Sequence, residues 1–171
     1  MVGLATMGIS PARDIMGQSG IMFFLASYAL TNLGAFAAII AISNKLDSDL
    51  INDYSGMIKR APVLALGLTL CLISLSGMPP AAGFMAKFYI FSTAVQHNLL
   101  WLVIIAVINS VISAFYYLRV VKVMWLGEPA SPEKVPSSGA LRLALALSCL
   151  GVLVLGIVPG TVMGLAQLAT R

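Results

Sequence analysis

Four long stretches of this chain contain no charged side chain. They cover residues 15–44, 61–86, 88–118 and 143–170, and none of them holds an Asp, Glu, Lys or Arg. Each is longer than the roughly 20 apolar residues that cross a bilayer as a helix. A backbone inside lipid must satisfy its own hydrogen bonds, and these stretches lack the polar–apolar alternation of barrel strands. They are therefore predicted to be helices.

Residues 61–118 carry one charge, Lys87, and their length fits three spans better than two. Proline disfavours helical geometry in the residue before it, so the run Gly77-Met78-Pro79-Pro80 is predicted to be a turn between two spans rather than a kink within one. The whole pattern predicts five membrane-spanning helices joined by polar loops at 44–60 and 127–139. The spans are expected at about residues 18–43, 61–78, 79–96, 99–121 and 141–159.

The composition agrees with a membrane protein and excludes an ordinary soluble domain. Hydrophobic residues make up 60% of the 171 positions and charged residues 9%, whereas soluble chains carry about a quarter charged residues. The net charge of +4 comes from basic residues that stand singly or in pairs, so no nucleic-acid partner is expected. The predicted fold class is an all-α membrane protein, with one transmembrane helical domain over residues 1–171 in contact with the lipid bilayer.

The ends of the chain suggest how it is placed. Residues 1–8 are weakly apolar with no basic region ahead of them, unlike a signal peptide, and turn residues follow at 10–14. The start therefore resembles the tail of an earlier helix, and we expect N-terminal helices that are absent from this sequence. Alternating five spans divides the basic residues five against four, which slightly favours a cytoplasmic start and proline-rich loop and an outside C-terminus.

Lys87 stands out because it lies in the middle of the third predicted span. It is about nine residues from either end, which is roughly 13 Å at the rise of an α-helix. A charge at the bilayer centre costs on the order of 3 kcal/mol, so such a residue normally faces a polar interior. A buried lysine that can exchange its proton suits a proton relay. The alternative is that Lys87 lies nearer an interface and extends its stem towards water.

The fourth predicted span carries a polar face. Asn109, Ser113 and Tyr116 stand at i, i+4 and i+7, with Ser110 and Tyr117 alongside, so they share one side of a helix. This face could line a channel and hold water beside Lys87. The competing interpretation, which the residue types favour somewhat, is ordinary hydrogen bonding between membrane helices.

The remaining polar and sulfur-containing residues suggest packing rather than chemistry. Ser27, Thr31, Gly34 and Ala38 form a small-residue stripe typical of close helix packing. Cys71 and Cys149 lie in apolar runs with no ligand-type neighbour at metal-binding spacing. No phosphate loop, CxxC or HExxH pattern is present, so no metal site and no cofactor is expected in this chain.

Several motifs resemble the antiporter-like membrane subunits of respiratory complex I (NADH-quinone oxidoreductase), and among them the subunit N family. They are YALTNLGAF at 28–36, DYSGMIKRAP at 53–62, LSGMPPAAGFMAKFY at 75–89 and NSVISAFYYLR at 109–119. The similarity covers roughly residues 20–125. It departs from the family at Ala86, where glycine is frequent, and a methyl group there is expected to stiffen the local backbone.

The resemblance implies that Lys87 matches the family's lysine on the broken helix of the exit-side half channel. It implies a proton-translocating membrane-arm subunit that couples NADH oxidation and quinone reduction to proton transport, and the family's other key residues would lie on earlier helices. NADH, FMN, iron–sulfur clusters and quinone would be bound by the wider complex, whose other membrane-arm subunits would be the partners. The implied location is the cell inner (plasma) membrane, with several crossings.

Two further interpretations stand beside this one. The chain could instead belong to a sodium/proton antiporter or to a membrane-bound hydrogenase, both of which share these helices. It could also be a truncated membrane fragment without activity. Failure to detect a full-length product would favour the last of these.

Overall fold

The computed structural model describes residues 15–48, 50–129, 135–160 and 164, and this part of the chain is helical without strands. The all-α membrane fold class is confirmed. Three helices are long and apolar enough to cross a membrane, over Gln18–Leu46, Leu100–Leu126 and Gly139–Ile157. In chain order the elements are α2 (Ile15–Leu46), the 3₁₀ helix η1 (Ile51–Tyr54), α3 (Met57–Arg60), α4 (Pro62–Ser76), α5 (Ala82–Gln96), α6 (Leu100–Leu126) and α7 (Gly139–Ile157).

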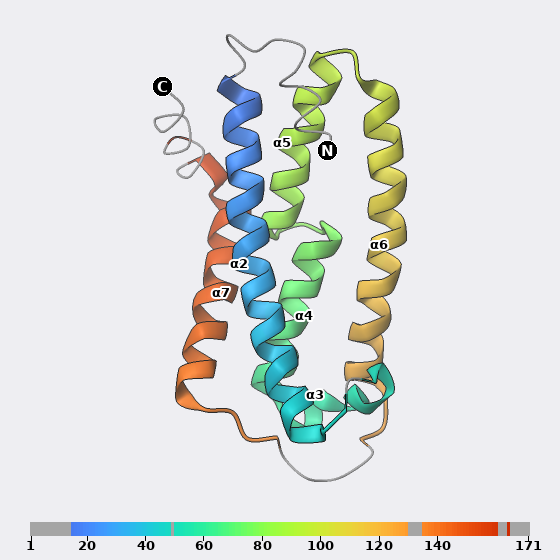
Figure 1. The fold of residues 1–171 in the computed structure, drawn as a ribbon, viewed down its shortest axis with the longest axis vertical. Helices are drawn as coiled ribbons and strands as arrows, with labels where there is room; N and C mark the ends of the chain where they lie inside the picture. The colour runs from blue at the N-terminus through green and yellow to red at the C-terminus, as the bar shows by residue number, and fades with distance from the viewer. Residues whose placement is uncertain (1–14, 49, 130–134, 161–163, 165–171) are drawn as a thin grey trace.

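Helices α4 and α5 lie end to end along one column (Figure 1). Helix α2 contacts both of them in turn. Near its start, Phe23 packs edge-on against Tyr89 of α5 with ring centroids 5.5 Å apart. Further along, Thr31 pairs with Ser74 of α4. The two short helices therefore follow one another along α2 and do not form an antiparallel hairpin.

The lengths of the helices lead to the same conclusion. α4 and α5 have 15 residues each, about 22 Å of helix, which is short of the roughly 30 Å hydrocarbon core. Placed in series they match the 32 residues of α2. The helical segments predicted at 61–78 and 79–96 are both present, but they lie in series as one interrupted column, and the described residues form four columns.

The interruption has a local cause in the residues between the two helices. Gly77 ends α4 with a left-handed φ of 86°, a conformation that suits glycine. The amides of Gly77 and Met78 both donate to the carbonyl of Ile73. Pro79 and Pro80 have no N–H to continue the ladder. Prolines stop a helix but do not set the direction of the next one, and packing against α2 and α7 keeps α5 in line with α4.

Because the described residues form four columns, the segments that meet at each end of the bundle differ from those expected for five spans. The start of α2 and the end of α7 lie at the same end of the bundle, and the connections around α3 and between α6 and α7 lie at the other (Figure 1). Apart from Lys87, every described Lys and Arg belongs to elements that reach that second end. They are Lys45, Lys59, Arg60, Arg119, Lys122 and Arg142.

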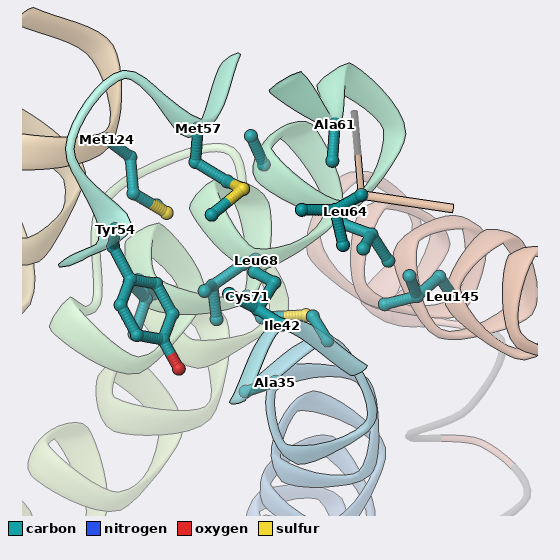
Figure 2. Close-up of a cluster of buried hydrophobic side chains, with 14 residues drawn as sticks. Ala35, Ile42, Tyr54, Met57, Ala61, Leu64, Leu68, Cys71, Met124 and Leu145 are labelled. Atoms are coloured by element: carbon teal, nitrogen blue, oxygen red, sulfur yellow. The ribbon is translucent and has the colours of Figure 1, made fainter. Parts of the chain in front are cut away.

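The described part of residues 44–60, which were expected to be a polar loop, folds back onto this basic end. Tyr54 of η1 and Met57 of α3 are buried and pack with Met124 of α6 over Ile42 and Leu68 (Figure 2). Across the cluster, Trp125 donates from Nε1 to the Thr69 hydroxyl at 2.9 Å. This core fixes α4 between α2, α6 and α7, so one half of the interrupted crossing is firmly anchored.

Gly83 in the first turn of α5 is expected to tolerate no side chain. A Cβ there would lie 1.8 Å from the Ser74 carbonyl oxygen, which is backbone and cannot rotate away. Gly83→Ala should therefore lower the free energy of unfolding by about 1–3 kcal/mol, measured as a lower thermal midpoint in detergent. Gly139→Ala is the matched control, because a Cβ at Gly139 meets nothing within 4 Å. Equal midpoints for the two variants would contradict the close approach of α4 and α5.

Candidate functional site

The break between α4 and α5 places a charged group against backbone carbonyls. The Lys87 Nζ donates to the carbonyl oxygens of Ser76 at 2.9 Å and Leu75 at 3.2 Å. These carbonyls belong to the last turn of α4, where the helix supplies no amide partner. The C-terminal end of a helix carries partial negative charge, which favours a cation. Lys87 thus reaches back from α5 to the end of α4, and its amine lies at the interruption rather than towards an end of the bundle.

The stem of Lys87 packs directly on Gly77. A Cβ at Gly77 would lie 2.8 Å from the Lys87 Nζ and 3.0 Å from its Cδ. Glycine at this position therefore serves two purposes: it allows the left-handed φ that ends α4, and it leaves the space in which the lysine lies.

The other side of the break is satisfied by a hydroxyl group. The first amides of α5 have no partner within their own helix, and the Gly83 amide donates to the Ser74 Oγ at 3.1 Å. Ser74 is fully buried. The interruption thus exposes carbonyls on α4 and amides on α5, and one side chain from each half reaches across to the other.

A cavity of about 220 Å³ opens beside this arrangement, between α2, α4, α5 and α6. Its polar lining includes the buried Ser27, whose Oγ has no hydrogen-bond partner among the described residues. Buried hydroxyls normally find a partner, and a cavity of this size can hold water. The polar residues that line it are Ser27, Tyr28, Thr31, Ser74, Lys87, Asn109, Ser110, Ser113 and Tyr117.

The structure brings together three of the four residues singled out in the sequence. Asn109 and Ser113 line the same cavity as Lys87, although the Ser113 hydroxyl donates within its own helix, to the Asn109 carbonyl at 2.8 Å. Tyr116 is 62% exposed and lies in a separate groove. The cavity-facing side of α6 is centred on Ser113 and Tyr117, about one helical turn apart, so the i+7 position lies past its edge.

Lys87 also borders a second, larger cavity of about 690 Å³ between α5 and α6. Its lining runs from Ser76 and Lys87 at the break to Gln96 at the far end of α5. Ser110 borders both cavities. The lysine thus stands between a small polar cavity and a mostly apolar one that extends away from the basic end of the bundle.

The sequence pattern indicated helix packing for Ser27 and Thr31 and did not single out Ser74. All three line the polar cavity, and their role depends on contacts between helices far apart in the sequence. Among the described residues, no group of three or more His, Cys, Asp or Glu side chains could hold a metal ion. The polar groups around the cavity are hydroxyls, an amide and an amine, all of which can form hydrogen bonds.

Comparison with known proteins gives consistent results. The family described as "NADH:quinone oxidoreductase/Mrp antiporter, TM" matches residues 1–113. The chain is 49% identical to NADH-quinone oxidoreductase subunit N of Dehalococcoides mccartyi over 171 residues, which is 100% of this chain and 35% of that protein. The chain therefore spans about a third of the length of this relative.

Two solved structures share the fold. In the respiratory complex I of Thermus thermophilus with bound aureothin, the matching chain is 26% identical with a TM-score of 0.72, covering 88% of this chain and 35% of that one. In the membrane-bound sulfane sulfur reductase, an archaeal respiratory membrane complex, the values are 30% and 0.81, covering 90% of this chain and 31% of that one.

The contact between Gly77 and Lys87 can be tested by a double-mutant cycle. Gly77→Ala should lower the free energy of unfolding by about 1–3 kcal/mol, because alanine is strained at this φ and its methyl group collides with the lysine. In a Lys87→Ala background the loss should be smaller, since only the backbone strain remains. The measurement is the thermal midpoint of the four proteins in detergent; additive effects would show that the two residues do not touch.

Proposed function

The chain belongs to the NADH:quinone oxidoreductase/Mrp antiporter membrane family, and from that membership we propose that it forms part of a proton-translocating membrane-arm subunit of an NADH:quinone oxidoreductase. The observation that carries the proposal is the position of Lys87, a lone cation at a helix interruption, held by two carbonyl oxygens and bordering two cavities. Such a group can accept a proton from one cavity and release it into the other.

In this proposal Lys87 is the proton-exchanging group, and the polar cavity lined by Asn109 and Ser113 supplies protons to it. The unpartnered Ser27 hydroxyl supports a hydrated cavity. The larger cavity leads from Lys87 to Gln96 and is the proposed exit. Electron transfer, and the binding of NADH, FMN, iron–sulfur clusters and quinone, belong to other subunits of the complex. Energy released there changes the free energy of protonated Lys87 by moving neighbouring charge.

The distribution of charge supports a direction for this transfer. Basic residues near membrane helices favour the cytoplasmic side, and the described ones other than Lys87 belong to elements at the end around α3. We therefore propose that this end faces the cytoplasm across a bacterial plasma membrane and that the exit cavity leads to the opposite side. Apolar side chains exposed on α6, including Ile104, Ile108 and Phe115, would contact lipid or neighbouring membrane-arm subunits.

A second candidate is a subunit of a sodium/proton antiporter, because the family description also names the Mrp antiporter. The 49% identity to a subunit N favours the first candidate. The two differ in their source of energy.

A native gel stained for NADH dehydrogenase activity, probed with an antibody against residues 44–60, should show the chain in the active band. Its absence from that band, together with sodium-driven proton exchange in vesicles that lack NADH, would favour the antiporter.

Lys87→Met in the full subunit should remove the exchangeable proton while keeping the length of the side chain. NADH-driven proton uptake by inverted membrane vesicles is expected to fall at least about tenfold, equivalent to about 1.4 kcal/mol or more in the barrier, while the amount of assembled complex stays within about a factor of two. Lys45→Met, at the exposed end of α2, is the matched control and should pump normally. Unchanged pumping by Lys87→Met in a normally assembled complex would refute the assignment.

A further inference from the structure

Three helices meet through hydroxyl groups at the break, and their hydrogen bonds have a defined direction. Thr31 of α2 donates its only hydroxyl proton to the Ser27 carbonyl at 2.6 Å. The Thr31 and Ser74 oxygens are 3.3 Å apart. Since the Thr31 proton is already used, Ser74 must be the donor of this bond. Ser74 in turn accepts from the Gly83 amide at 3.1 Å.

These bonds make a continuous chain of four groups: the Gly83 amide of α5 donates to Ser74 of α4, which donates to Thr31 of α2, which donates to the Ser27 carbonyl. Each donor is used once, and successive bonds of this kind polarise and strengthen one another. Thr31 is 2% exposed and Ser74 is fully buried, so water competes little for either hydroxyl. Ser74 thus connects α4 to α5 through Gly83 and to α2 through Thr31.

The same residue lies immediately before the carbonyls that hold Lys87. Leu75 and Ser76 follow Ser74 in the last turn of α4, and Lys87 follows Gly83 by four residues on α5. The Ser74–Gly83 bond therefore sets the distance between the helix that carries the lysine and the helix that holds its amine. A loss of this bond frees α5 to shift against α4 and changes the environment of the Lys87 Nζ without removing any atom that touches it.

We propose that Ser74, oriented by Thr31, is a positioning residue for Lys87, and that the hydroxyl chain from Gly83 to Ser27 keeps the two halves of the interrupted crossing in register for proton exchange. The inference rests on the proposed function of Lys87. Ser74 itself transfers no proton in this account; it acts through the position of the lysine.

The test uses the complete complex in inverted vesicles and compares Ser74→Ala, Ser74→Thr, Thr31→Val and the double variant Ser74→Ala/Thr31→Val. Ser74→Ala should lower NADH-driven proton uptake about five- to tenfold at normal complex levels, and the pH at which uptake is half-maximal should move. Ser74→Thr keeps the hydroxyl and should restore most of the rate. Thr31→Val should act in the same sense as Ser74→Ala, and the double variant should be little worse than Ser74→Ala alone, because the two residues act as a unit.

Thr93→Val is the matched control for Thr31→Val. Thr93 is also buried, and its hydroxyl donates to the carbonyl of Tyr89 four residues earlier at 3.0 Å, but it lies outside both cavities that border Lys87. It should leave the uptake rate and its pH profile unchanged. If Thr93→Val were as impaired as Thr31→Val, the inference would be overturned, because the loss of any buried hydroxyl would then be enough to lower proton uptake.

The possible outcomes separate this inference from the proposed function. If Lys87→Met abolishes uptake while Ser74→Ala and Thr31→Val keep the normal rate and pH profile, Ser74 does not position the lysine and the proposed function stands. If Lys87→Met pumps normally, both are overturned. If Ser74→Ala fails to assemble, Thr31→Val decides, since it keeps the Ser74–Gly83 bond partners in place: an unchanged pH profile would overturn the inference and a displaced one would support it.

Discussion

The structure depends on how an interrupted helix satisfies its backbone inside an apolar layer. A continuous helix pairs all of its amides and carbonyls internally, whereas a break leaves orphan carbonyls on one side and orphan amides on the other, each costing several kcal/mol in hydrocarbon. Here Lys87 supplies donors to the carbonyls of Leu75 and Ser76, and Ser74 supplies an acceptor to the Gly83 amide. The cation that would be costly in lipid is thus also the group that completes the end of α4.

The rest of the bundle serves to hold this break in place. α2 runs past both half-helices, with Phe23 against α5 and Thr31 against α4. α7 does the same, since Leu145 packs in the core that contains α4 and Val152 packs with residues of α5. The short helices η1 and α3 lie at the basic end of the bundle (Figure 1) and contribute Tyr54 and Met57 to the buried core (Figure 2). The two uninterrupted helices α2 and α7 therefore support the interrupted column of α4 and α5, and α6 completes the cavity beside it.

Much of this could be predicted from the sequence, and the errors have one origin. The length of the charge-free stretches predicted the helices, and Pro79 and Pro80 predicted where one helix ends. Whether the next helix doubles back or continues is decided by contacts such as Tyr89 with Phe23, which no local pattern contains. This arrangement places α4 and α5 in one column and so determines which segments meet at each end of the bundle. The same limit applies at the site: Lys87, Asn109 and Ser113 stood out by type and spacing, whereas the part played by Ser74 exists only because Thr31 and Gly83 lie beside it.

The lysine belongs to one half-helix and its hydrogen-bond acceptors belong to the other. Its proton affinity and the separation of the two halves are therefore thermodynamically linked, and the linkage is reciprocal. A force that slides α5 against α4 must change how firmly the proton is held, and a change of protonation must exert a force along the column. If Lys87 exchanges a proton as proposed, the break couples a displacement elsewhere in an assembly to proton uptake or release, and the reverse.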